Sequence, residues 1–265
     1  LGYLLSILLV FVYLNMFPAV RYIVQHWGET PVLVLPILVT LVVLAGIVLL
    51  FINTSGLNHG KRNMAAVITG VIICLATLAI TDPIAPVKRI HVVEYMVLSL
   101  LVRYTMSVRL QGNALLLFSI IFSSLLGVHD ELLQGLHPLR TYGTRDILVN
   151  MLGSIGGGLI WHGFGLFQEY TRPASQPAKV PGSLYFSQAL LICSVCFLCI
   201  PLYYFREQTL PLWPAAPLII SLFLFITVIR NVNSPVSHGI RAVSYASFTL
   251  IAYIPATWLF NIRFF

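Results

Sequence analysis

Residues 31–52 read PVLVLPILVTLVVLAGIVLLFI, a stretch without a single charged side chain. A helix needs about 20 predominantly apolar residues to cross the hydrocarbon core of a membrane, and this run is long enough to do so. Similar apolar runs recur along most of the chain. The sequence therefore predicts an all-α protein, a polytopic transmembrane helical bundle.

The overall composition indicates the same fold class. Hydrophobic residues make up 58% of the chain, charged residues make up 9%, and the mean hydropathy is +0.93. A soluble domain carries about 25% charged residues, so a surface this poor in charge belongs in lipid. The formal net charge of +7 comes from basic residues in short connections between apolar runs, where such residues set topology and meet anionic head groups. We therefore expect membrane lipids as partners and no nucleic acid.

Hydropathy predicts about nine membrane spans joined by short polar connections. They lie near residues 2–22, 31–52, 64–81, 91–110, 113–129, 146–164, 185–205, 214–230 and 242–260. A proline-rich stretch, residues 171–183, resembles a linker. We expect three parts: two N-terminal transmembrane helices in 1–63, a helical core in 64–165, and C-terminal transmembrane helices in 184–265.

Two clusters of polar residues lie at the ends of predicted spans. Lys88, His91 and Tyr95 are three and four residues apart, so they share one face of a helix, with an acidic residue at 94 beside them. The second cluster, DELLQ, contains Asp130 and Gln134 at a spacing of four. These two side chains share a face, and the intervening Glu131 is expected to point elsewhere.

A third cluster begins the sixth predicted span, after the P-x-R sequence that ends at Arg140. Its members follow one helical stripe: Asp146, Asn150, Gly153 and Gly157. The stripe is polar at the start of the helix and small deeper in. Because small residues let another helix backbone approach closely, we expect Gly153 and Gly157 to be helix-packing positions.

The charges of these clusters balance, four basic against four acidic. They are Lys88, Arg89, Arg140 and Arg145 against Glu94, Asp130, Glu131 and Asp146. An unpaired charge at membrane depth costs at least about 2.5 kcal/mol, so a balanced set favours contact between the clusters. We expect the three clusters to meet in one polar patch at one membrane face. Arg103 lies well inside the fourth span, so it either extends to the membrane interface, which we favour, or reaches a polar partner in the interior.

In their order, spacing and placement at helix ends, the clusters resemble the VanZ-like family of membrane proteins. The resemblance rests on K-x-x-H-x-x-x-Y at 88–95, D-E-x-x-Q at 130–134, P-x-R at 138–140 and D-x-x-x-N-x-x-G at 146–153. With the flanking helices it covers about residues 64–165. It implies a small bundle of membrane helices associated with the cell envelope and with lowered sensitivity to glycopeptide antibiotics, teicoplanin above all. Typical members are shorter, so the outer helices lie outside the resemblance.

Two interpretations of the clusters remain open. They form either an ion-pair network that locks helix ends together or a pocket for a polar group, such as a lipid head, a glycan or a peptide terminus. The pocket hypothesis assigns ligand binding to Lys88, His91, Tyr95, Asp130, Glu131, Gln134, Arg140, Asp146 and Asn150. Within it, we expect Glu131 to serve mainly the ligand and Asp146 mainly the structure.

Three classes of function remain open as well. The first is a VanZ-like protein of the bacterial inner membrane, whose pocket binds a lipid-linked or peptidoglycan-derived group. The second is an accessory structural subunit of a larger membrane protein complex, because the outer helices present long apolar surfaces. The third is a membrane-embedded enzyme on a lipid-linked substrate, with Asp130 or Glu131 as a base near His91. The sequence shows no activated nucleophile, so no catalytic residue is assigned.

No metal site and no cofactor are predicted. The histidines do not follow the H-E-x-x-H spacing of a zinc site. Cys193, Cys196 and Cys199 have a helical spacing, but no histidine follows Cys196, so the attachment motif for c-type haem is missing. We expect these thiols, and Cys74, to pack as small apolar side chains.

Overall fold

The computed structural model describes residues 1–53, 62–81, 85–137, 140–167, 182–205, 207–229 and 236–265. Most of the predicted linker, residues 171–183, lies outside these ranges, as does Pro138 of the P-x-R sequence. Within them the chain is helical and contains no strand beyond a single bridge between Gln208 and Phe264. The predicted all-α fold class is confirmed.

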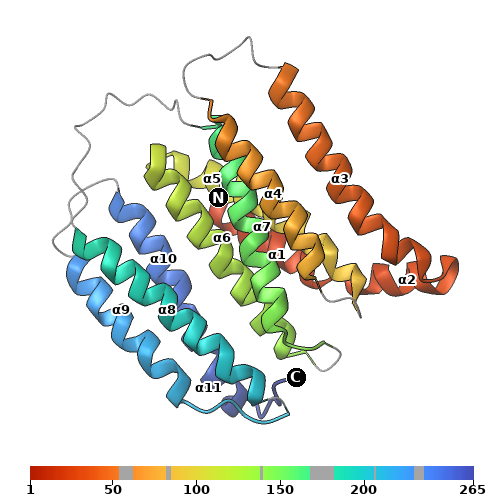
Figure 1. Ribbon diagram of the computed structural model, residues 1–265. Coiled ribbons are helices and arrows are strands. Elements are labelled where there is room, and N and C mark those ends of the chain that lie inside the picture. The colour runs from red at the N-terminus through yellow and green to blue at the C-terminus, as the bar shows by residue number, and fades with distance from the viewer. Residues whose placement is uncertain (54–61, 82–84, 138–139, 168–181, 206, 230–235) are drawn as a thin grey trace.

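The α-helices follow one another along the chain (Figure 1). They are α1 Gly2–Leu14, α2 Phe17–Trp27, α3 Thr30–Asn53, α4 Met64–Ile80, α5 His91–Ser107, α6 Gly112–Gly135, α7 Thr144–Gly163, α8 Gly182–Tyr204, α9 Ala216–Ile229, α10 Val236–Ile251 and α11 Tyr253–Leu259. Two 3₁₀ turns precede helices, η1 (Pro86–Ile90) before α5 and η2 (Trp213–Ala215) before α9.

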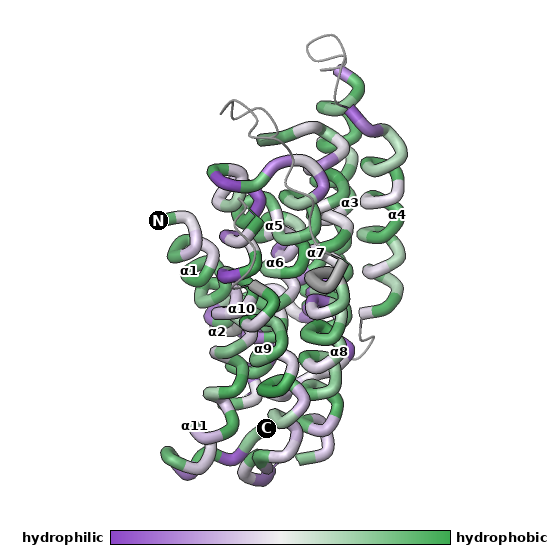
Figure 2. The backbone as a smooth tube through the Cα atoms, turned by 90° about the vertical axis from the view of Figure 1, so that its left-hand side faces the viewer, coloured by the Kyte–Doolittle hydropathy of each residue, from purple (hydrophilic) through white to green (hydrophobic). Residues whose placement is uncertain are grey.

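The protein is membrane-embedded. Among the described residues, five helical segments are long and apolar enough to cross a membrane, and α4 and the segment containing α9 are shorter apolar helices. The five are Gly2–Trp27, Thr30–Asn53, Gly112–Gly135, Phe186–Tyr204 and Val236–Leu259. Hydrophobic positions predominate along the helices in Figure 2. Each of these seven segments overlaps one of the predicted spans; the other two predicted spans correspond to α5 and α7.

These last two helices, α5 and α7, stand in the middle of the bundle. α7 packs against α4, α5 and α6, and α5 also packs against α1 and α6. In Figure 1, α2 and α3 lie on one side of this central group and α8, α9 and α10 on the other. Lipid therefore faces the apolar outer helices, while the polar and glycine positions of α5 and α7 are enclosed by protein.

Two predicted spans differ in detail from the observed helices. The predicted span at 2–22 is two helices, because the chain turns at Asn15 and Met16. The side chain of Asn15 donates a hydrogen bond to the carbonyl oxygen of Phe11 at 2.7 Å, and Pro18 in the first turn of α2 lacks the N–H that would continue α1. The predicted span at 242–260 begins earlier, at Val236, and is divided between α10 and α11.

The end of the chain joins the C-terminal helices to the central ones. The backbone N–H of Phe265 donates to the carbonyl oxygen of Gly135 at 2.7 Å, and the N–H of Tyr142 donates to the carbonyl oxygen of Phe265 at 2.8 Å. The hydroxyl of Tyr142 donates to the carbonyl oxygen of Cys199 on α8 at 2.7 Å. These bonds seal the end of α6 and the start of α7, where the polar clusters lie.

Candidate functional site

The structure brings the three predicted clusters together at one end of α5, α6 and α7. We call this group the polar cluster. Its members are Lys88, His91, Glu94, Tyr95, Asp130, Glu131, Gln134, Arg140, Asp146 and Asn150. Helix-to-helix hydrogen bonds connect the three elements, so the cluster also fixes their relative positions.

An ion pair connects the chain before α5 to the start of α7. Nζ of Lys88, in η1, donates to Oδ2 of Asp146. The Asp146 side chain is 4% exposed, whereas that of Lys88 is 21% exposed. Asp146 lies in the first turn of α7, where a negative charge also interacts favourably with the helix dipole. This pair has the geometry expected of a structural contact.

His91 and Glu94 form a second pair within the first turn of α5. Nδ1 of His91 and Oε2 of Glu94 are 2.6 Å apart, and both side chains are buried. From α1, the hydroxyl of Tyr13 donates to the carbonyl oxygen of Glu94 at 3.0 Å. The His91 ring meets the Tyr95 ring edge to face, with centroids 6.3 Å apart. Among the described residues, the Glu94 carboxylate therefore pairs with His91 alone.

Tyr95, Asp130 and Asn150 meet around Gly127 of α6. The Tyr95 hydroxyl donates to Oδ2 of Asp130 at 2.8 Å, and Nδ2 of Asn150 donates to the carbonyl oxygen of Gly127 at 3.3 Å. A Cβ at Gly127 would lie 2.7 Å from Cβ of Asn150 and 3.1 Å from the Tyr95 ring, so only glycine fits. Gly127 was not among the predicted packing positions, although a small residue three positions before Asp130 is a signal for close helix approach.

Two acceptors at this junction have no partner. Oδ1 of Asp130 and Oδ1 of Asn150 are buried and accept no hydrogen bond from the described residues. Both parent side chains are fully buried. A buried polar atom without a hydrogen bond costs about 1–3 kcal/mol, so the junction has unused capacity for a donor.

Glu131 makes its contacts on the other side of α6. Nε2 of Gln134 donates to Oε1 of Glu131 at 2.9 Å, and the backbone N–H of Gly143 donates to Oε2 at 3.2 Å. Nη2 of Arg140 donates to Oε1 of Gln134 at 2.6 Å. Helical spacing places Glu131 on a different face of α6 from Asp130, and Gly143, just before α7, covers this second face as well.

The polar cluster is enclosed rather than open. Asp130, Glu131 and Asn150 are fully buried, whereas Lys88 and Arg140 are partly exposed and lie at its edge. A polar group from outside would therefore enter past the two cations. The hydrogen bonds described above for Glu131 and Asp146 are made within the protein, and spare acceptors remain on Asp130 and Asn150.

The predicted packing glycines of α7 lie against α5. A Cβ at Gly157 would be 2.7 Å from Cα of Met96 and 2.9 Å from its carbonyl oxygen, and a Cβ at Gly153 would be 3.1 Å from the carbonyl oxygen of Val92. Gly156 faces α4 instead, where a Cβ would be 2.9 Å from the carbonyl oxygen of Gly70. This backbone-to-backbone contact holds α7 against both neighbours.

Of the two expectations for Arg103, the structure shows the interior partner, and the side chain is fully buried. Nε donates to the carbonyl oxygen of Leu166 at 3.0 Å, while Nη1 and Nη2 have no hydrogen-bond partner in the described part of the chain. The turn after α7 supplies the carbonyl oxygen and covers the guanidinium group. Arg103 lies near the far end of α5 and does not belong to the polar cluster.

Neither a metal-ligand arrangement nor a similar known protein assigns a function to the polar cluster. Within the described residues, no group of three His, Cys, Asp or Glu side chains is placed to hold a metal ion. No protein-family model, no curated protein and no solved structure matches the chain. The VanZ-like resemblance therefore stays a prediction based on the clusters themselves.

Proposed function

We propose that this protein is a VanZ-like protein of the bacterial inner membrane and that its polar cluster binds a hydrogen-bond donor of an envelope component. The component is a lipid-linked or peptidoglycan-derived molecule, and the donor is an amino or hydroxyl group. The proposal rests on the order and spacing of the clusters in the sequence. It is supported by the unused acceptors in the structure.

The observation that carries the proposal is the pair of unpartnered acceptors, Oδ1 of Asp130 and Oδ1 of Asn150. Asp130 accepts from the Tyr95 hydroxyl through its other oxygen, and Asn150 donates to Gly127, which lies against the Tyr95 ring. An amino or hydroxyl group placed there would satisfy acceptors that otherwise remain buried without hydrogen bonds. Amino groups, hydroxyls and peptide N–H groups are all present in glycan and peptide ligands of the envelope.

The two interpretations, pocket and lock, apply to different residues. Asp146 accepts from Lys88 through Oδ2, and both oxygens of Glu131 accept from protein donors, which is what the lock interpretation requires. Asp130 uses one oxygen for Tyr95 and keeps the other unused. We therefore assign the ligand contact to Asp130 and Asn150, and a positioning role to Glu131.

A matched pair of substitutions tests this assignment. Asp130→Asn keeps an oxygen to accept from Tyr95 and replaces the spare acceptor by an N–H donor, which would oppose a ligand donor. The variant should fold with little loss of stability and lose the ligand. Glu131→Gln places an N–H group against an existing donor, so it should lower thermal stability, at a cost of about 1–3 kcal/mol.

The measurement has two parts. Wild-type and variant proteins are purified in mild detergent, their thermal stability is measured, and co-purifying lipids and glycans are identified by native mass spectrometry. Each is also expressed in a glycopeptide-sensitive bacterium to measure teicoplanin susceptibility. A well-folded Asp130→Asn protein that retains the same ligand and the same phenotype as wild type would refute the proposal. A protein partner that co-purifies with both would favour an accessory subunit instead.

A further inference from the structure

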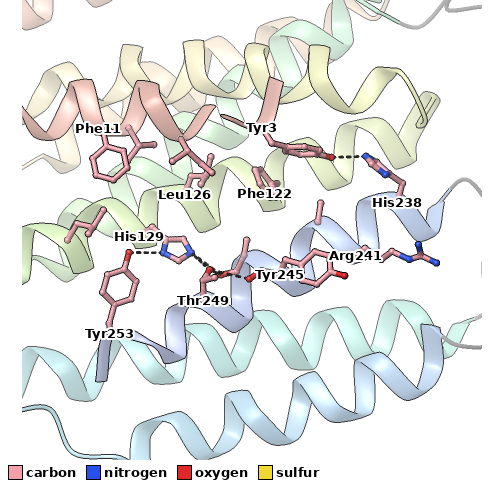
Figure 3. Close-up of a pocket in the computed structure, with 15 residues that line it drawn as sticks. Tyr3, Phe11, Phe122, Leu126, His129, His238, Arg241, Tyr245, Thr249 and Tyr253 are labelled. Carbon is pink, nitrogen blue, oxygen red and sulfur yellow. Dashed lines mark hydrogen bonds between the residues drawn. The ribbon is translucent and has the colours of Figure 1, made fainter. Parts of the chain in front are cut away.

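A groove separate from the polar cluster runs between α1, α6 and α10 (Figure 3). Its volume is about 650 Å³, within the roughly 300–1,000 Å³ typical of ligand sites. The walls are largely apolar and aromatic and include Phe11, Phe122 and Leu126. Phe11 is 47% exposed, and Tyr245 on α10 is 71% exposed. The groove is therefore open along its side to the surrounding lipid.

Positive charge gathers at one end of the groove. His238 lies there on α10, with Nε2 2.9 Å from the hydroxyl of Tyr3 (Figure 3). Arg241 on α10 and Arg109, in the connection between α5 and α6, both act electrostatically on His238. Among the described residues, the two guanidinium groups have neither a hydrogen-bond nor an ion-pair partner, and no acidic side chain lines the groove. This end is complementary to an anion.

The polar groups at the other end of the groove already have partners. The two ring nitrogens of His129 lie 3.0 Å from the hydroxyl of Tyr253 and 2.9 Å from the carbonyl oxygen of Ala246. The hydroxyl of Thr249 donates to the same carbonyl oxygen at 2.8 Å. Because these groups satisfy one another, this end offers a surface that an apolar chain can contact without leaving a buried polar group unpaired.

The length of the groove matches one leaflet of a bilayer. At 1.5 Å per residue, α10 rises about 16 Å from His238 to Thr249, and α6 rises about the same from Phe122 to Leu133. Half of the hydrocarbon core is about 15 Å thick.

We propose that the groove binds one acyl chain of an anionic phospholipid, with the lipid phosphate against Arg241 and Arg109. The apolar walls hold the chain, and the basic end selects the head group. A zwitterionic lipid fits the same walls but gains less from the two unpaired guanidinium groups. The residues of α6 that line the groove are other than Gly127 and Asp130, which meet Tyr95, and the site does not depend on the function proposed for the polar cluster.

The test is lipid retention by the purified protein. The protein is reconstituted in nanodiscs that contain equal amounts of phosphatidylglycerol and phosphatidylcholine, released into detergent, and examined by native mass spectrometry. The wild-type protein should retain one phosphatidylglycerol. Arg241→Gln should lower this retention roughly fivefold, since a basic residue near anionic lipid contributes about 1 kcal/mol. Ala242→Phe, which fills the groove, should reduce retention of both lipids.

Two controls separate the site from general effects. Arg263→Gln removes an exposed charge outside the groove, and it should leave retention unchanged. Asp130→Asn should also retain phosphatidylglycerol, so failure of the proposed function and failure of this site give different results. Equal retention of both lipids by the wild-type protein would overturn the proposal. So would an Arg241→Gln protein that retains phosphatidylglycerol as well as the wild type.

Discussion

Gly157 is the position where one added methyl group should most directly disturb the bundle. An alanine Cβ there would lie 2.5 Å from Oγ of Ser99, 2.7 Å from Cα of Met96 and 2.9 Å from the Met96 carbonyl oxygen. Ordinary contact begins at 3.4 Å, so the shortfall against the Met96 backbone is about 0.7 Å. The Ser99 hydroxyl can rotate away, but the backbone of α5 cannot, so α5 and α7 must separate.

Gly157→Ala should therefore destabilise the protein by about 1–3 kcal/mol, the usual cost of overpacking a well-packed interior. Gly46 on α3 is the matched control, because nothing lies within 4 Å of a Cβ built there. Gly46→Ala should be neutral or stabilise α3 by about 0.5–1 kcal/mol, since alanine is the better helix former. The two changes add the same methyl group to a helix and differ in what it meets.

The assay is the loss of the monodisperse peak in size-exclusion chromatography after heating the detergent-solubilised protein. The midpoint should fall for Gly157→Ala, fall further for Gly157→Leu, and stay or rise for Gly46→Ala. If Gly157→Ala and Gly46→Ala had the same midpoint as the wild type, α7 would not be seated on the α5 backbone. The glycine stripe would then face lipid.

Removal of single buried charges tests the bundle by the same assay. Asp146→Asn leaves Lys88 without its carboxylate, and because Lys88 is partly exposed we expect a loss of about 1.5–3 kcal/mol, the value of a hydrogen bond to a charged group; an unchanged midpoint would show that the pair is not structural. Arg103→Met removes a buried guanidinium group with two unpartnered nitrogens, and its apolar replacement should not lower the midpoint. A clear loss of stability in Arg103→Met would show that its bond to Leu166 outweighs the cost of burying the charge.

The all-α fold could be predicted because long apolar segments indicate helices surrounded by lipid. The meeting of the polar clusters could also be predicted, since spans of known order alternate in direction and return their ends to the same face. The break between α1 and α2 at Asn15 was harder to predict from the sequence. Pro18 was visible in the sequence, but a proline in the first turn of a helix is as compatible with the start of a span as with an interruption.

The side-chain details could not be predicted because they depend on what lies across from each helix. Helical spacing places Asp130 and Glu131 on different faces of α6, but it does not show that the segment at Gly143 covers the second face. Burial of Arg103 likewise depends on the carbonyl oxygen of Leu166, far away in the sequence. The lipid groove is assembled from α1, α6 and α10, so no single segment of the sequence carries its pattern.

The arrangement of the bundle explains why structural and ligand-binding roles share one cluster. Helices in lipid are not driven together by the hydrophobic effect, so close packing and polar contacts must hold them. α7 uses glycines over most of its length and Asp146 at its start for this purpose. The bonds of Glu131 then fix the start of α7 over the end of α6. With those bonds in place, a buried acceptor that remains unpaired, as on Asp130, contributes nothing to holding the helices. A ligand that supplies the missing donor would remove this cost in stability. Asp130→Asn keeps the bond to Tyr95 and changes only the spare acceptor, so we expect this variant to lose ligand binding and to keep its folding stability.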